Sequence, residues 1–250
     1  MVTLAIDLGT TNSLVSCWKD GEVHLIPTVF ESYLTPSVVG VDDKGAIITG
    51  APAKERLRTH PDHTVAAFKR AMGSDKLFKI GSHILRAEEL SSFVLKSLKA
   101  DAEAWLGTTV TQAIISVPAY FNDLQRKATV AAGRLAGLQV LRLVNEPTAA
   151  ALAHGLHESE STFVVLDIGG GTFDISIMEL FEGIMQIRSS AGDNYLGGED
   201  FVDLIIKSIA DKHAIQLEKL TGQQLAGFRE VAENLMKTVS TQQSASYQLV

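Results

Sequence analysis

Two short stretches of the sequence combine an acidic residue with a glycine loop, and that combination can bind phosphate. Residues 4–13 read LAIDLGTTNS and residues 164–174 read VVLDIGGGTFD. In both, an apolar run typical of a strand leads to an aspartate and then to glycine and threonine. Glycine lets backbone N–H groups approach an anion closely, because no Cβ stands in the way. The sequence therefore predicts two phosphate-binding loops, formed by Gly9, Thr10 and Thr11 and by Gly169, Gly170, Gly171 and Thr172.

The aspartates that end the two strands, Asp7 and Asp167, predict a metal site. If the loops face each other, the two carboxylates lie across one cleft and repel each other. A hydrated Mg²⁺ carried by a polyphosphate relieves that repulsion. The alternative is that the aspartates cap turns and the glycines make hairpins, as single copies of this pattern often do. Neither loop has the GxxxxGK[ST] pattern of a P-loop, and no GxGxxG with an acidic partner supports a dinucleotide fold.

A lysine between apolar residues could act on the bound phosphate. Residues 66–73 read AAFKRAMG and contain Lys69 and Arg70. A lysine aimed at a γ-phosphate would neutralise charge as the phosphoryl group is transferred. The spacing by itself favours a different interpretation, in which Lys69 lies on a solvated helix face.

The surrounding pattern predicts an α/β protein of two lobes, built by duplicating one module. Hairpins are expected at Asp20-Gly21 and between Asp42 and Gly45. Apolar periodicity and end signals predict helices over 51–60, 88–106, 122–136, from 146, over 197–214 and over 221–240. Strands are expected over 111–118, 138–145, 162–168, 173–180 and 184–191. We expect lobe I to span residues 1–160 and the first part of lobe II to span residues 161–250.

Composition narrows the class of protein. The chain has 250 residues, of which 46% are hydrophobic and 20% charged, as is ordinary for a globular protein. A net charge of −7 provides no basic surface for nucleic acid or for an anionic membrane. The single cysteine, Cys17, excludes an intrachain disulfide and fits a reducing cytoplasm. Because we find no signal peptide and no apolar stretch of roughly 20 residues, we expect a cytoplasmic protein.

Six motifs together resemble the DnaK-type, 70-kDa heat-shock chaperone family. In chain order they are IDLGTTNS (6–13), FKRAMG (68–73), VPAYFNDLQRKAT (117–129), NEPTAAALAHGL (145–156), DIGGGTFDISI (167–177) and GDNYLGGEDF (192–201). The third and sixth are highly specific, whereas DxGTT and EPTAAA also fit the wider actin and sugar-kinase superfamily. The short stretch between Met72 and Glu88 is similar to the HscC branch of bacterial members. The resemblance implies an actin-like ATPase fold, in which duplicated ribonuclease H-like lobes close on Mg-ATP.

The resemblance also implies roles for single residues, and it reverses the solvated interpretation of Lys69. That lysine would position the attacking water and steady the γ-phosphate. The other catalytic residues would be Glu146, Thr172 and Asp174. Asp7 and Asp167 would hold hydrated Mg²⁺, and K⁺ would bind near Asp174. Pro118 and Arg126 would relay the state of the nucleotide, ATP or ADP, to another domain. The nucleotide-binding residues would be Gly9, Thr10, Thr11, Asn12, Gly169, Gly170, Gly171, Thr172, Gly197, Gly198, Glu233, Lys237 and Ser240.

The sequence departs from the family pattern in two places. The family's adenosine-side helix reads roughly ExxKRxxxS, but residues 233–240 read ENLMKTVS, so Met236 stands where a lysine is usual. Methionine can pack on adenine but cannot donate a hydrogen bond, so we expect weaker nucleotide affinity. The family's second adenine-binding glycine loop and its peptide-binding domain do not follow Val250. We therefore expect a fragment or truncated product with an incomplete lobe II and exposed apolar surface.

The function implied by the resemblance is ATP hydrolysis that drives a molecular chaperone in protein folding. Its partners would be a J-domain co-chaperone and a nucleotide exchange factor, and unfolded client peptides would bind only through the absent domain. A sugar or acetate kinase of the same superfamily would need an aspartate base and a small-substrate pocket, and VPAYFNDLQR argues against it. A filament protein or a nucleotide-dependent scaffold is the third interpretation. ATP consumption that a J-domain protein stimulates, without a phosphorylated sugar, would separate the first interpretation from the others.

Overall fold

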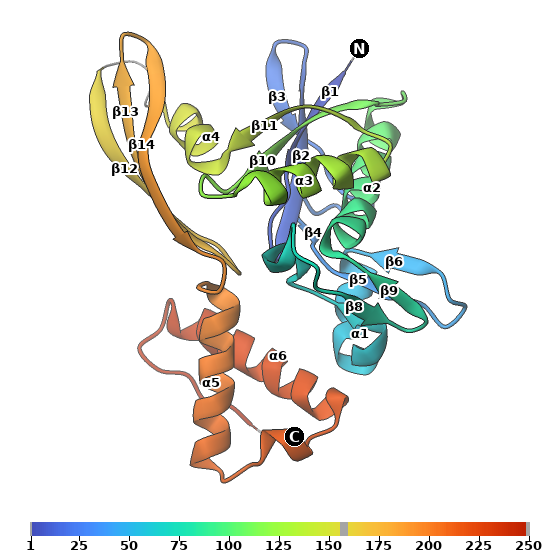
Figure 1. The fold of residues 1–250 in the computed structure, drawn as a ribbon. Coiled ribbons are helices and arrows are strands. Elements are labelled where there is room, and N and C mark those ends of the chain that lie inside the picture. The colour runs from blue at the N-terminus through green and yellow to red at the C-terminus, as the bar shows by residue number, and fades with distance from the viewer. Residues whose placement is uncertain (1, 156–159, 249–250) are drawn as a thin grey trace.

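A computed structural model describes residues 2–155 and 160–248 of the protein. We keep the name lobe I for the described residues up to 160 and lobe II for residues 161–248. Both lobes contain strands and helices, which confirms the mixed α/β fold expected of an actin-like ATPase. The lobe boundary at 160/161 stays a prediction, and the last residue of the motif at 145–156 lies outside the described residues. Figure 1 shows the sheet of lobe II beside lobe I, and its two long helices beyond one end of that sheet.

The main sheet of lobe I brings together strands from its two ends. Its strands are β1 (Thr3–Asp7), β2 (Asn12–Lys19), β3 (Glu22–Leu25), β10 (Gln112–Val117) and β11 (Gln139–Asn145), in the order β11-β10-β1-β2-β3. A short strand, β4 (Thr35–Pro36), pairs with β2 beside this path. Strand β1 runs parallel to β10 and antiparallel to β2. The hairpin predicted at Asp20-Gly21 is confirmed, with φ of 54° and 90° at the two residues.

Helices cover this sheet and complete the core of lobe I. They are α2 (Ala87–Leu106), α3 (Asp123–Leu135) and α4 (Glu146–Ala153). Asn122 caps α3, because its side chain accepts a hydrogen bond from the Gln125 N–H. Helix α4 follows β11 with no intervening loop, which places Glu146 at the end of the sheet. The largest fully buried side chains of this core are Phe68, Leu4, Ile26, Ile80, Leu90, Leu95, Leu98, Ile115, Leu138, Val15 and Val39.

The outer part of lobe I is a small subdomain of short elements. They are β5 (Val39–Val41), β6 (Ile47–Thr49), α1 (Ala51–Thr59), η1 (Pro61–His63), β7 (Thr64–Val65), η2 (Phe68–Ala71), β8 (Phe78–Ile80) and β9 (His83–Leu85). Strands β5, β6 and β7 form one sheet, and β8 and β9 form a separate hairpin. The hairpin predicted between Asp42 and Gly45 is the β5–β6 turn.

Lobe II repeats the opening of lobe I. Strands β12 (Ser161–Ile168), β13 (Phe173–Phe181) and β14 (Ile184–Asp193) form an antiparallel meander, as β1, β2 and β3 do. In lobe II Asp167 pairs with Asp174, and in lobe I Asp7 pairs with Leu14. The predicted repeat is therefore confirmed for these three strands, in their order and in the register of the first pair. The chain continues through α5 (Gly198–Lys212), η3 (Leu217–Lys219) and α6 (Gly222–Val239).

One face of the lobe II sheet is apolar and exposed. Along β12 the side chains alternate between the two faces, and Val164, Leu166 and Ile168 are exposed, as is Ile177 on β13. The opposite face buries Met178 and other β13 side chains. The exposed side chains confirm the expected exposure of apolar surface for this sheet. A monomer rarely leaves so regular an apolar face open to water.

Candidate functional site

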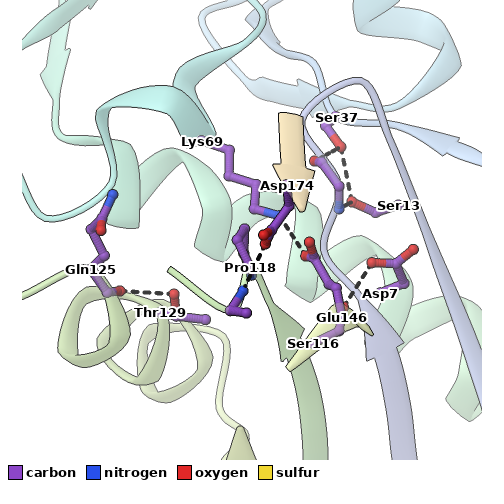
Figure 2. Close-up of polar contacts among 12 residues, drawn as sticks. Asp7, Ser13, Ser37, Lys69, Ser116, Pro118, Gln125, Thr129, Glu146 and Asp174 are labelled. Carbon is purple, nitrogen blue, oxygen red and sulfur yellow. Dashed lines mark hydrogen bonds and ion pairs between the residues drawn. The ribbon is translucent and has the colours of Figure 1, made fainter. Parts of the chain in front are cut away.

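The first glycine loop joins β1 to β2 and is held from behind by two serines. Ser37 Oγ donates to the Gly9 carbonyl at 2.8 Å, and Ser13 Oγ lies 2.9 Å from Ser37 Oγ. The Gly9 N–H in turn donates to Ser13 Oγ at 3.2 Å. Figure 2 shows the two serines beside the loop. A Cβ on Gly9 would lie 2.0 Å from the Asn12 carbonyl oxygen, so this tight turn requires glycine.

The second glycine loop joins β12 to β13 and rests on the start of α5. The Gly169 N–H donates to the Thr172 carbonyl at 2.9 Å and closes the turn. The N–H groups of Gly198 and Glu199 donate to the carbonyls of Gly169 and Gly170, at 3.1 and 2.7 Å. The predicted residue Gly197 has a structural reason, since a Cβ there would lie 2.8 Å from the Gly169 carbonyl oxygen. The GDNYLGGEDF motif therefore supports the second loop.

The two loops face each other at close range, as the sequence predicted. A Cβ on Gly170 would lie 1.8 Å from Thr11 Oγ1, and a Cβ on Gly171 would lie 2.2 Å from Thr10 Cγ2. The hydroxyls of Thr10 and Thr11 are buried and have no hydrogen-bond partner among the described residues. Such donors are suited to an anion that enters between the loops, because burial without a partner is costly.

Lys69 is buried and paired, so the solvated interpretation of its spacing is wrong. Its Nζ lies 3.0 Å from Glu146 Oε1, and the two side chains are only 5% and 15% exposed. Burial raises the pKa of the Glu146 carboxyl; Lys69 opposes that shift, and the nearby Asp7 and Asp167 add to it. The structure thus brings together four of the predicted site residues from both lobes (Figure 2 draws Lys69, Glu146 and Asp7).

The predicted metal ligands lie within electrostatic reach of each other. Asp7 accepts a hydrogen bond from Ser116 Oγ at 2.7 Å. Burial raises the pKa of Asp167, and the negative charge of Asp7 raises it further. No group of three or more His, Cys, Asp or Glu side chains is placed to hold a metal within the described ranges. The two aspartates therefore offer an acidic pair rather than a closed coordination shell, which suits a cation that keeps most of its water.

Asp174 connects the second loop to the predicted relay. It accepts a hydrogen bond at 2.9 Å from the N–H of Ala119, the residue directly after Pro118. Figure 2 shows the Asp174 carboxylate close to Pro118. Burial raises the pKa of Asp174, although that hydrogen bond acts in the opposite direction. Arg126 binds the carbonyls of Phe121 and Ala119 at 2.9 and 3.1 Å. The same guanidinium donates to the Asn145 side chain, one residue before Glu146, at 2.9 Å. Pro118, Arg126, Asp174 and Glu146 are therefore in one connected region.

A second part of the site lies between the loops and α6. A cavity of about 180 Å³ is lined by Glu233, Met236 and Lys237, and it also reaches the two loops through Asn12 and Gly170. Burial disfavours ionisation of Glu233, but Lys237, 2.6 Å away, outweighs it, and the pKa of Glu233 is lowered. The predicted residue Ser240 is not among the described residues that line this cavity, and its hydroxyl donates to the carbonyl of Met236 in the last turn of α6.

A larger cleft opens beside this cavity, between α1 of lobe I and α6 of lobe II. Its volume is about 930 Å³, and Thr10, Thr11 and Glu233 are among its lining residues. The two hollows share Thr11, Lys54, Glu199, Arg229 and Glu233. A ligand with a compact charged end and a longer organic part could therefore place the charged end between the loops.

Sequence reasoning missed several residues that shape the site. Ser13 and Ser37 support the first loop, and Tyr120 joins the lobes through a 2.7 Å hydrogen bond from its hydroxyl to Asn194. Arg70 pairs with Asp200 across the lobes. All of these residues except Ser37 lie within the six motifs quoted above. The hydrogen-bond partner of each one, however, lies far from it in sequence. Only the fold could reveal those pairs.

Comparisons with known proteins identify the relatives of the chain. A family model described as Hsp70 protein matches residues 3–80 and 76–250. Chaperone protein DnaK of Thermotoga petrophila is 44% identical over 98% of this chain, and so is Chaperone protein DnaK of Thermotoga neapolitana. The chain spans 42% of the length of these relatives. The assignment to the HscC branch stays a prediction.

No helix in the described parts of the chain has both the length and the apolar character needed to cross a membrane.

The family model covers nearly every residue, and the relatives match over almost the whole chain at well above 30% identity. The facing glycine loops and the buried Lys69–Glu146 pair lie within the matched regions. This chain belongs to the Hsp70 family.

Proposed function

We propose that this chain binds Mg-ATP between its lobes and hydrolyses it as the nucleotide-binding part of a molecular chaperone. The observation that carries the proposal is the Lys69–Glu146 pair, buried where the two glycine loops face each other. A buried cation beside two anion-binding loops is an arrangement that stabilises a transferring phosphoryl group. The relatives' printed name, Chaperone protein DnaK, supports the chaperone part of the proposal.

The phosphates would lie between the loops. Backbone N–H groups around Gly9 and Gly170 would bind their oxygens, together with the hydroxyls of Thr10 and Thr11, which are buried without partners among the described residues. Thr172, at the end of the second loop, would support the γ-phosphate. A bound Mg²⁺ would neutralise charge on the phosphates, and Asp7 and Asp167 would hold it through its water ligands.

Lys69 and Glu146 would act on the attacking water. Glu146 fixes the lysine through one carboxylate oxygen and can orient water with the other. Lys69 would hold the water and the γ-phosphate near each other and neutralise the charge that develops during transfer. Asp174 would lie beside a K⁺ site. A shift of Asp174 would move Pro118 and Arg126 through its hydrogen bond with the Ala119 N–H.

The adenosine part would lie toward α6. Glu233 and Lys237 line the small cavity and are suited to the ribose hydroxyls, and Met236 offers an apolar surface to the base. Gly197 and Gly198 would hold the second loop in place beneath the phosphates. Ser240 stays a prediction, since its hydroxyl points to its own helix.

ATP and ADP would bias the lobes toward different arrangements, because only ATP places a γ-phosphate against both loops. Arg126 and Pro118 would pass that difference to a peptide-binding domain. We propose a cytoplasmic protein that works with a J-domain co-chaperone and a nucleotide exchange factor on unfolded clients. ATP use without phosphorylation of a sugar would distinguish this function from a kinase, and the absence of ATP-dependent sedimentation would distinguish it from a filament protein.

The test is the substitution Lys69→Ala in the protein. Single-turnover hydrolysis of ATP should fall by roughly 10²–10³-fold, the usual size of such electrostatic contributions. ATP binding, measured by calorimetry, should remain, because the loops supply most of the phosphate contacts. The matched control is Lys207→Ala, which removes an exposed lysine of α5 and should leave both quantities unchanged. Turnover of the Lys69→Ala protein at the rate of the unmodified protein would contradict the assigned role.

A further inference from the structure

A guanidinium from lobe I is held by a carboxylate of lobe II beside the candidate site. Arg70 Nη1 and Nη2 lie 3.1 and 2.5 Å from the two carboxylate oxygens of Asp200, which makes the pair bidentate. The Arg70 guanidinium also lies over the ring of Tyr195, 5.9 Å from its centroid. Paired hydrogen bonds of this kind fix orientation as well as distance. The two lobes are therefore joined here in a defined geometry.

Each end of this pair is anchored to one part of the proposed reaction centre. Arg70 follows Lys69 in the single turn η2, so a shift of one residue moves the other. Asp200 lies in the first turn of α5, whose Gly198 and Glu199 N–H groups hold the second glycine loop. The ion pair thus connects the turn that carries Lys69 to the loop that would carry the phosphates.

The arginine also touches the second loop directly. A Cβ on Gly171 would lie 2.9 Å from Arg70 Nε, so the guanidinium packs against the backbone of that loop. This nitrogen is buried and has no hydrogen-bond partner among the described residues. Separation of the lobes would have to break both the packing and the ion pair.

A second ion pair between the lobes is much weaker in its geometry. Arg58 Nη1 lies 3.5 Å from Glu230 Oε2, and the two side chains are 64% and 56% exposed. The corresponding values for Arg70 and Asp200 are 14% and 27%. Exposed pairs contribute little because water and salt screen them. The Arg70–Asp200 pair is the better candidate for controlling the separation of the lobes.

We propose that Arg70 and Asp200 are positioning residues that keep the lobes closed on the nucleotide and hold Lys69 against the second loop. The inference rests on the proposed function, and it adds two residues to it. Loss of the pair would let the lobes separate more often, so bound ADP would leave faster. It would also let the turn that carries Lys69 move, so hydrolysis would slow even when ATP saturates the site.

The test compares Arg70→Gln, Asp200→Asn and the double variant of the protein. Stopped-flow release of a fluorescent ADP should become about tenfold faster in each single variant, and single-turnover hydrolysis at saturating ATP should slow by a similar factor. The double variant should behave like either single variant, because both remove the same interaction. Arg188→Gln is the control: it breaks the Arg188–Glu179 pair, which lies within lobe II, and should change neither rate.

Circular dichroism and thermal melting would check that each variant is folded. If Arg70→Gln does not fold, Arg70→Lys replaces it, since lysine keeps the charge but not the bidentate geometry and should still speed ADP release. Unchanged ADP release in Asp200→Asn, or additive effects in the double variant, would overturn the inference. Failure of the unmodified protein to hydrolyse ATP would instead overturn the proposed function, so the two failures are distinguishable.

Discussion

Asp167 has a raised pKa because burial and the charge of Asp7 both oppose its ionisation. The folded protein therefore binds a proton at Asp167 at pH values where the unfolded chain, with an ordinary aspartate pKa of about 3.9, has released it. At pH values between the pKa of Asp167 in the unfolded chain and its pKa in the folded protein, the free energy of unfolding falls as pH rises. At neutral pH and without nucleotide, Asp167 therefore lowers the free energy of unfolding.

Replacement Asp167→Asn should therefore stabilise the nucleotide-free protein at pH 7, seen as a higher urea midpoint. The gain should vanish below about pH 3, where aspartate is protonated in both states. The same variant should hydrolyse ATP more slowly and depend less on magnesium, a loss of function that often accompanies relief of a strained site. Asp211→Asn, an exposed change on α5, is the control. A midpoint lower than that of the unmodified protein at pH 7 would contradict the electrostatic argument.

At the scale of elements, the first glycine loop depends on β4 and the residue after it. Besides the Ser37 hydroxyl, the Ser37 N–H donates to the Thr11 carbonyl at 2.9 Å, so this segment holds the loop at both Gly9 and Thr11. Ser37 and Ser13 are buried, so neither hydroxyl can be replaced by bulk water. Removal of Ser37 Oγ would leave the Gly9 carbonyl and Ser13 Oγ with one partner fewer.

Ser37→Ala should lower the free energy of unfolding by about 1–3 kcal/mol, the cost of leaving buried polar groups unpaired. It should also weaken ATP binding, because the loop loses its support. Ser91→Ala is a well-matched control, since Ser91 is equally buried on α2 but its hydroxyl has no partner among the described residues. That change should be neutral or stabilising. Denaturant unfolding of both variants checks the difference, and equal effects would mean that the hydrogen bonds of Ser37 contribute nothing.

The elements differ in how far the sequence could predict them. The turn at Glu182-Gly183 could be predicted, because glycine supplies the positive φ that such hairpins need. The turn η2 could not: its preceding residue, Ala67, has φ of 54°, which alanine rarely adopts. Long-range contacts anchor the turn that follows Ala67, among them the Lys69–Glu146 pair, whose partners are 77 residues apart in sequence. The spacing of apolar residues cannot predict such a long-range pair. The role of Lys69 could therefore be predicted only from the family resemblance.

At the scale of the whole molecule, the duplicated aspartate-glycine phrase predicted two lobes and two facing loops, and the strand registers confirm the repeat. The contacts that join the lobes could not be predicted in the same way. These contacts are the hydrogen bonds between Tyr120 and Asn194 and between Arg70 and Asp200. Each of them joins residues from two different motifs. A single sequence specifies each lobe through local pattern, whereas the fit between lobes depends on shape. The fit between the lobes can be tested at a glycine where the backbone of one lobe approaches a side chain of the other.

Gly192 of β14 is such a position. A Cβ there would lie 2.3 Å from Tyr120 Cδ1 and 2.8 Å from the Phe173 carbonyl oxygen. The Tyr120 ring could rotate away only by giving up its 2.7 Å hydrogen bond to Asn194, and the Phe173 carbonyl is fixed in the sheet. Gly192→Ala should therefore wedge the lobes apart and lower the free energy of unfolding by about 1–3 kcal/mol, as overpacking does.

The matched control is Gly227→Ala in α6, where no atom outside the helix backbone lies within 4 Å of an added Cβ. Because alanine restricts the unfolded chain and favours helix, that change should instead stabilise the protein by about 0.5–1 kcal/mol. Denaturant unfolding measures both effects, and they should have opposite signs. If Gly192→Ala proved as stable as Gly227→Ala, the lobes would not be in close contact at Tyr120, and the closed arrangement on which nucleotide binding depends would need a different interface.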